Sequence, residues 1–204
     1  YIVADYLKQG FLNIKDSTTV SEKCWRMEGS RMFIQEGKKV LIDDLMRGMI
    51  VQSGNDAACA LAEHIAGTQE DFASLMNDYA QKMELKNTNF TNPTGLPNVN
   101  HYSTAEDIAK LSIVLINDFP DEYSIYSEKE FTYNDIRQLN RNSLLWQDDS
   151  IDGIKTGHTR ASGYCLVASS KRADMRLISI VLNSAAEKSR LQATRRLLAY
   201  GFKS

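Results

Sequence analysis

Two short motifs in this chain combine side chains that suit acyl-transfer chemistry. The first is Ser53-Gly54-Asn55, and the second, Lys155-Thr156-Gly157, follows about a hundred residues later. A hydroxyl near a carboxamide can relay a proton and recognise an amide, whereas an ammonium near a hydroxyl can bind an anionic group. Gly157 also removes a side chain where an extended peptide could pair with the backbone. The two triplets in this order are more specific than either alone.

Both motifs also have a simpler structural explanation. Ser53 or Asn55 could do no more than cap the helix that follows. A lysine such as Lys155 on an edge strand often serves only to discourage pairing with other strands. The residues alone leave both alternatives open.

Helical patterns precede and follow the first motif. Asp43 or Asp44 can cap a helix that ends just before Ser53, and a second helix is expected from about Asn55 to Ile65, stopped by Gly67. Apolar residues at helical spacing predict a third helix, and a capping box at Ser103 and Glu106 predicts a fourth through about Asn117. The first motif is therefore expected between two helices, in a largely helical region.

The C-terminal third changes to the pattern of β-strands. Apolar or β-branched runs predict strands over residues 151–159, 163–170 and 175–183, with a turn at 171–174. Lys155 then lies on the first of these strands. A capping box from Ser184 to Glu187 predicts a final helix, whose inward residues should be Leu191, Thr194, Leu197 and Leu198.

Composition and charge limit the classes of partner. The chain has 204 residues, 43% of them hydrophobic and 25% charged, which suits one or two compact units. A net charge of −2 gives no basic field, so we expect no nucleic acid partner. The cysteines and histidines have no metal-ligand spacing, so we expect no zinc and no cofactor. Cys59 and Cys165, each flanked by apolar residues, are expected to fill the core as small side chains.

The chain resembles the low-molecular-mass penicillin-binding proteins that are serine D-alanyl-D-alanine carboxypeptidases (the peptidase S11 family). Besides the two triplets, the similar segments cover nearly the whole chain: Gln52–Ala58, Tyr123–Tyr126, Arg137–Asn142 and Asp152–Thr159. The resemblance implies the α+β fold of the penicillin-recognising serine enzymes, with an antiparallel sheet flanked by helices and a helical subdomain. Residues 1–204 would be an incomplete catalytic domain, with the helical subdomain at about 42–118 and the C-terminal strands and last helix at about 150–204.

One element of the family pattern is absent. No Ser-x-x-Lys sequence occurs in the chain, and Tyr1 to Leu7 start within a helical pattern without an initiator Met or a cap. The resemblance implies that the nucleophilic serine and its lysine lie about two turns before Tyr1, and that two N-terminal strands and any targeting signal are also missing. We therefore expect the 204 residues alone to be inactive.

The resemblance also implies a role for each candidate residue. Ser53 would pass a proton to the departing amine, and Asn55 would bind the acyl-side amide and steady the missing lysine. Lys155 would complete the catalytic electrostatics, and with Thr156 and Arg190 it would receive the substrate's terminal carboxylate. Gly157 would leave room for the substrate, and the backbone N–H of His158 would be one donor to the oxyanion.

The expected reaction releases D-Ala from peptidoglycan pentapeptides through an acyl-enzyme, and β-lactams would acylate the same serine. Family members act at the periplasmic face of the bacterial inner membrane, and any membrane association would depend on segments outside this chain. One alternative is a class A-like β-lactamase, for which Glu130 to Asn134 imitate the required spacing, although Glu130 to Tyr133 reads better as a strand. Another is a non-catalytic remnant that binds wall peptides.

Overall fold

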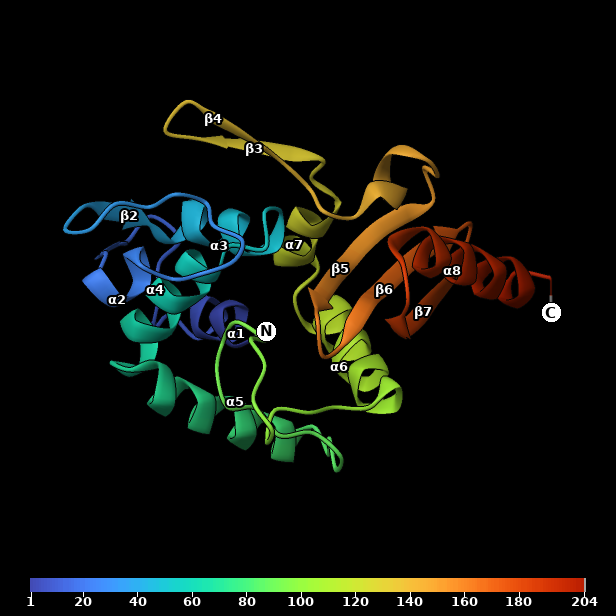
Figure 1. Ribbon diagram of the computed structural model, residues 1–204, viewed down its shortest axis with the longest axis horizontal. Coiled ribbons are helices and arrows are strands. Elements are labelled where there is room, and N and C mark those ends of the chain that lie inside the picture. The colour runs from blue at the N-terminus through green and yellow to red at the C-terminus, as the bar shows by residue number, and fades with distance from the viewer. Residues whose placement is uncertain (204) are drawn as a thin grey trace. The chain divides into compact units, whose positions relative to one another are not determined.

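The computed structural model describes residues 1–203 and divides them into two compact units (Figure 1). The first unit comprises residues 1–103 and 130–140, and the second comprises residues 104–129 and the chain from 141 onwards. Helices and antiparallel sheets occur in both, so the expected α+β class is confirmed. The units divide the chain differently from the helical subdomain that we expected at 42–118, because the first unit starts at Tyr1 and the helix at 105–118 belongs to the second.

The first unit is built around one buried helix, α4. Every residue from Asp56 to Ala62 is buried, and the helix packs against α2, α3 and α5. The run of small side chains on α4 lets these neighbours approach from several sides. The elements of this unit are α1 (Ile2–Lys8), β1 (Ser17–Thr19), α2 (Glu22–Trp25), β2 (Lys39–Leu41), α3 (Ile42–Ile50), α4 (Asn55–Ala66), α5 (Gln69–Lys82), β3 (Glu130–Tyr133) and β4 (Ile136–Leu139).

The second unit is a three-stranded antiparallel sheet with helices packed on it. The strands pair in the order β5, β6, β7, and α8 lies along β6 and β7, while α6 also contacts β7 (Figure 1). Its core contains Leu144, Leu166 and Leu198. The elements are α6 (Ala105–Asp118), α7 (Pro120–Tyr123), the 3-10 helices η1 (Ser124–Ser127) and η2 (Ser143–Trp146), β5 (Ile151–Thr159), β6 (Gly163–Arg172), β7 (Met175–Ser184) and α8 (Glu187–Gly201).

The expected helices and strands are present, but three of the expected caps are wrong. Helix α3 begins at Ile42 after Leu41, so Asp43 and Asp44 lie in its first turn. Carboxylates in this turn still interact favourably with the helix dipole. Thr104, not Ser103, caps α6 by accepting from the backbone N–H of Asp107 at 3.2 Å. Ala186 precedes α8 without a side-chain cap, so the box from Ser184 is not formed. A cap depends on the backbone angles of one residue, which periodicity does not fix.

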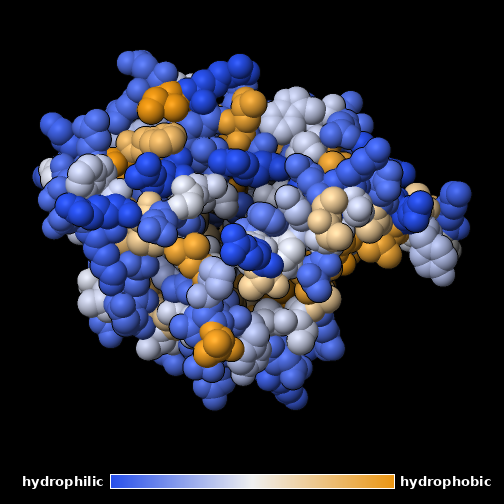
Figure 2. Space-filling view, in the orientation of Figure 1, coloured by the Kyte–Doolittle hydropathy of each residue, from blue (hydrophilic) through white to orange (hydrophobic). Residues whose placement is uncertain are grey.

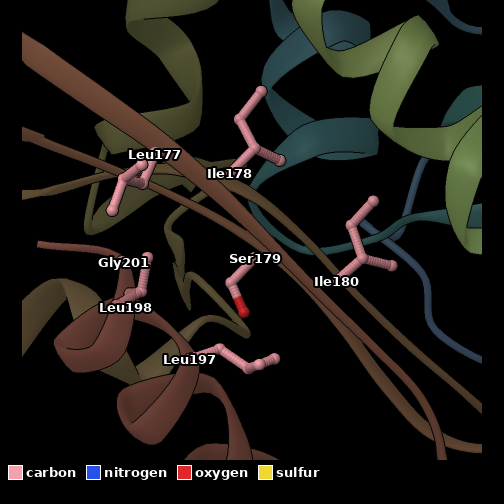
Figure 3. Close-up of a pocket in the computed structure, with 7 residues that line it drawn as sticks. All are labelled: Leu177, Ile178, Ser179, Ile180, Leu197, Leu198 and Gly201. Atoms are coloured by element: carbon pink, nitrogen blue, oxygen red, sulfur yellow. The ribbon is translucent and has the colours of Figure 1, made fainter. Parts of the chain in front are cut away.

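The expected inward face of α8 is only partly correct. Thr194 and Leu198 are buried, but Leu197 is 49% exposed. Leu197 borders a small apolar hollow between α8 and β7, in which Ser179 points towards the helix while Ile178 and Ile180 point to the opposite side of the strand (Figure 3). This hollow is separated from the Lys155 motif by strand β6.

A disulfide joins Cys24 of α2 to Cys59 of α4, with 5.3 Å between the Cα atoms. Cys59 is buried as expected, but it is bonded to Cys24 and does more than fill the core as a small side chain. Cys24 and Cys59 are 35 residues apart, and only the packing of α2 on α4 brings them together. Glu63 lies beside the two sulfurs, but sulfurs joined to each other are not thiolate ligands for a metal. Cys165 is free and half-buried.

The face of the molecule drawn in Figure 2 is largely polar. Figure 2 shows hydrophilic residues over most of the visible face, with apolar residues in small groups. Among residues 1–203, no helix is both long and apolar enough to cross a membrane.

Candidate active site

The first motif forms the short connection between α3 and α4. Ser53 has a φ of 63°, and Asn55 is the first residue of α4. Gly54 occupies the N-cap position, where no side chain makes a capping hydrogen bond. The capping explanation of Ser53 and Asn55 is therefore wrong, because neither side chain satisfies the start of this helix.

Asn55 is held by the backbone of the segment before β2. Its side-chain Nδ2 donates to the carbonyl oxygen of Glu28 at 2.6 Å, and its backbone N–H donates to that of Ser30 at 2.8 Å. A carbonyl can only accept, so this contact fixes which end of the carboxamide is the nitrogen. Gly29 approaches so closely that a Cβ there would lie 2.8 Å from Nδ2, and its φ of 83° also favours glycine.

Asp56 ties the same segment to α4. Its side chain is buried, and its carboxylate accepts from the backbone N–H groups of Met32 at 2.9 Å, Phe33 at 2.9 Å and Ile34 at 3.3 Å. It also accepts from the N–H of Ala57 at 2.9 Å. A carboxylate with several N–H donors can stay buried because its lone pairs are satisfied. This role of Asp56 was not predicted from the sequence, although its position directly after Asn55 in the motif was a signal.

Lys155 of the second motif lies on β5, which is an edge of the three-stranded sheet among the described residues. Its Nζ donates to the carbonyl oxygen of Thr156 at 3.2 Å. Burial and the nearby charges of Arg141 and Arg190 lower the pKa of Lys155 to about 8. A lysine that only discourages strand pairing would be fully solvated, so this environment favours the functional interpretation.

The start of β5 is fixed by residues from the other family-like segments. Asn142 donates from Nδ2 to the carbonyl oxygen of Gly153 at 3.2 Å. Tyr123 donates from its hydroxyl to Asp152 at 3.1 Å, and a Cβ at Gly153 would lie only 2.5 Å from that hydroxyl oxygen. Arg176 forms an ion pair with Asp152 at 2.7 Å. Through these contacts Tyr123 and Asn142 help to place the strand that carries Lys155, a role that was not predicted from the sequence.

Gly157 and His158 follow Lys155 along the same strand. Gly157 pairs with Cys165 on β6, and a Cβ at Gly157 would make only an ordinary contact, 3.8 Å from the Cβ of Cys165. The packing within this unit therefore leaves room for a side chain at Gly157. The ring of His158 stacks on Tyr164, with 4.0 Å between the ring centroids.

Arg190 is buried in the second unit, with a relative exposure of 3%. Its Nη2 donates to Glu187 at 3.0 Å and its Nη1 donates to the carbonyl oxygen of Cys165 at 3.3 Å. Nε is buried and makes no hydrogen bond within the described chain. The guanidinium thus adds positive charge near Lys155, while its direct contact with a substrate stays a prediction.

The two motifs lie in different compact units. The structure brings Ser53 together with Asn55 in the first unit, and Lys155 together with Thr156, Gly157, His158 and Arg190 in the second. Each group has defined local geometry.

Comparison with known proteins gives consistent matches over the whole chain. Residues 1–186 match the family described as D-alanyl-D-alanine carboxypeptidase (Peptidase_S11). The chain is similar to D-alanyl-D-alanine carboxypeptidase DacA of Haemophilus influenzae, with 48% identity over 207 residues, covering 99% of this chain and 53% of the relative. The chain therefore spans about half the length of the curated relatives it matches.

Solved structures show the same likeness. Penicillin-binding protein 5 from Haemophilus influenzae has a TM-score of 0.96 and 48% identity, covering all of this chain and 60% of that one. Penicillin-binding protein D2 from Listeria monocytogenes, in its ampicillin-bound form, has a TM-score of 0.89 and 28% identity, covering 98% of this chain and 82% of that one. The expected penicillin-recognising fold is thereby confirmed.

Proposed function

Because this chain belongs to the D-alanyl-D-alanine carboxypeptidase family, we propose that its protein is a serine-type carboxypeptidase that removes the terminal D-Ala from peptidoglycan pentapeptides. The hydroxyl oxygen of a serine attacks the carbonyl carbon of the penultimate D-Ala, the C–N bond breaks, and the terminal D-Ala leaves with a proton. Water then hydrolyses the resulting ester. A β-lactam is attacked in the same way, and its ring opens to form a penicilloyl ester.

The observation that carries this proposal is the environment of Lys155. Its ammonium lies near two further positive groups, Arg141 and Arg190, on an edge strand whose next residues are Thr156 and Gly157. Such a concentration of positive charge suits the terminal carboxylate of a peptide substrate. Gly157 leaves space for a peptide backbone to approach the strand.

The remaining residues take the following roles in the proposal. Ser53 delivers a proton to the leaving amine, and Asn55 donates to the amide on the acyl side of the substrate. The backbone N–H of His158 is one oxyanion donor, and the N–H of the nucleophilic serine is the other. We place that serine and its Ser-x-x-Lys partner on polypeptide before Tyr1, so the reaction needs more than these 204 residues.

We further propose that the protein is exported and acts at the periplasmic face of the inner membrane. The Cys24–Cys59 disulfide supports this location, because disulfides persist in oxidising compartments and are rare in the cytosol. Pentapeptides and β-lactams are the proposed partners, and any contact with the membrane is assigned to segments outside this chain.

The β-lactamase alternative is weaker. It needs Glu130 as a general base on a loop, whereas Glu130 lies on strand β3 and accepts a hydrogen bond from Nε of Arg137 at 3.0 Å. Hydrogen bonding and the charge of Arg137 lower the pKa of Glu130, which makes it a weaker base. The remnant alternative, in which wall peptides bind without reaction, is distinguished from the proposed enzyme by an assay of D-Ala release.

The deciding experiment uses the full-length protein and a peptide that ends in D-Ala-D-Ala. We expect release of free D-Ala, together with a stable penicilloyl adduct by intact-mass spectrometry after exposure to penicillin. Rapid penicillin turnover without D-Ala release would favour the β-lactamase. Peptide binding with neither product would favour the remnant.

A further inference from the structure

The disulfide lies one helical turn from the residue that we propose binds the substrate amide. Cys59 is four positions after Asn55 on α4, so the two side chains lie on the same side of that helix. Its partner Cys24 is in α2, and both cysteines are completely buried. The covalent link therefore fixes α2 to the first turns of α4.

The chain that leaves α2 leads directly to the atoms that hold Asn55. Residues 26–34 contain no helix or strand, so their position depends on their anchors. Within them, the carbonyl oxygens of Glu28 and Ser30 accept from the side chain and backbone of Asn55 at 2.6 and 2.8 Å. Glu28 is only four residues from Cys24, a short distance along an irregular chain.

Two of the contacts that hold this segment on α4 lie at its ends, and the bonds from Asn55 to Glu28 and Ser30 lie between them. The disulfide holds it at Cys24, and the carboxylate of Asp56 holds it at Met32 to Ile34 through three backbone N–H groups. If the first anchor is removed, the second still keeps the far end on α4. Glu28 lies nearest to the lost anchor, so the position of its carbonyl oxygen should then vary most.

We propose that the Cys24–Cys59 disulfide is a positioning element for Asn55, acting through the carbonyl oxygen of Glu28, and that its reduction slows acylation. The inference rests on the proposed function, because it assigns the disulfide to the same reaction. A dithiol reductant supplies two electrons and two protons. The S–S bond breaks, two thiols form, and the reductant becomes its own disulfide. Reoxidation by a small-molecule disulfide such as oxidised glutathione reverses the effect, because the two thiols pass two electrons and two protons to that disulfide and the S–S bond forms again.

The test uses the full-length protein carrying Cys165→Ser, so that Cys24 and Cys59 are the thiols of this chain that can react. Penicillin acylation is measured on oxidised protein, on protein reduced with dithiothreitol, and on the reduced sample after reoxidation. Alkylation followed by mass spectrometry counts the thiols, and circular dichroism confirms that the reduced protein is folded at the assay temperature. We expect about a tenfold slower acylation rate constant on reduction, restored by reoxidation, because small displacements of positioning groups cost this much or more.

A second variant covers the case in which the buried disulfide resists the reductant. Cys24→Ala with Cys59→Ala removes the link permanently and should give the same loss. Acylation at the oxidised rate in this folded double variant, or in protein shown to be reduced, would overturn the inference.

Asn55→Ala separates positioning from general loosening of the fold. If the disulfide acts through Asn55, reduction should change the acylation rate of Asn55→Ala less than twofold, since the positioned group is gone. A further tenfold loss would show that the disulfide acts elsewhere. Failure of the proposed function is distinguishable, because the oxidised protein would then release no D-Ala from the peptide, whatever the effect of reduction on acylation.

Discussion

The surroundings of Lys155 disfavour the charged form of its side chain. Burial and two nearby guanidinium groups lower its pKa to about 8, from an ordinary value of 10.5. The unfolded chain therefore binds more protons between these two pH values, and the free energy of unfolding should rise with pH across this window. Below pH 8 the folded protein carries the full cost of a confined ammonium. A substrate carboxylate would relieve that cost.

The first prediction is that the acylation rate falls at alkaline pH because Lys155 loses its proton. The penicillin acylation rate of the full-length protein should fall as pH rises through about 8, because the ammonium that attracts the carboxylate is lost. Lys155→Arg should be slower overall, yet keep its rate to a higher pH, since arginine stays protonated. The measurement is a pH profile of both proteins. The same alkaline midpoint in both would assign the titration to another group.

The second prediction concerns the carboxamide of Asn55. Asn55→Ala should lower the acylation rate of the full-length protein by about 10–100-fold, because a hydrogen bond aimed at the reacting amide is removed. Stopped-flow measurements with a chromogenic cephalosporin would give the rate, and thermal unfolding would show whether the variant remains folded. An unchanged rate would refute the role of Asn55 and leave its bond to Glu28 as a purely structural contact.

At the scale of elements, Asp56 supplies three of the hydrogen bonds that join helix α4 to the segment before β2. The third prediction is that Asp56→Ala lowers the free energy of unfolding by about 3–5 kcal/mol, because several buried backbone N–H groups lose their acceptor. Urea unfolding would measure the change. Asp78→Ala, at an exposed position on α5, is the matched control and should have little effect. Equal losses in the two variants would contradict the argument.

Strand β5 contains two glycines that differ sharply in their surroundings. The fourth prediction is that Gly153→Ala destabilises the protein by about 1–3 kcal/mol, since its Cβ would meet the hydroxyl of Tyr123 at 2.5 Å. Gly157→Ala should leave the thermal midpoint nearly unchanged, because its Cβ would meet only Cys165 at 3.8 Å. It should nevertheless slow acylation by obstructing the substrate. A larger loss of stability at Gly157 would be the opposite of what this packing predicts.

The sequence predicted the type of the elements around the two motifs well, but it predicted the contacts between elements poorly. The three strands around Lys155 and the helix from Asn55 follow from local periodicity, which a single segment displays. The roles of Asp56 and Cys24 do not, because these partners lie 22 to 35 residues away and meet them only after packing. Caps failed for a related reason, since Thr104 and Ser103 are equally suitable residues and backbone geometry selects one.

At the scale of the whole molecule, each compact unit fixes its own motif by its own means. A disulfide and a buried carboxylate hold the first motif, whereas an antiparallel sheet holds the second. The proposed reaction draws on both units and on a serine that neither contains in the Ser-x-x-Lys form. The chemistry is thus proposed to be a property of the longer protein.

The last prediction follows from that requirement. The isolated 204 residues should form no penicilloyl ester and release no D-Ala, because Ser53 lacks a lysine three positions later to act as its base. Intact-mass spectrometry after penicillin exposure is the measurement, with the full-length protein as the positive control. Circular dichroism and a count of one free thiol would show that the fragment is folded with its disulfide formed. An adduct on the folded fragment, mapped to Ser53 by peptide sequencing, would make Ser53 the nucleophile and overturn the assignment of an upstream serine.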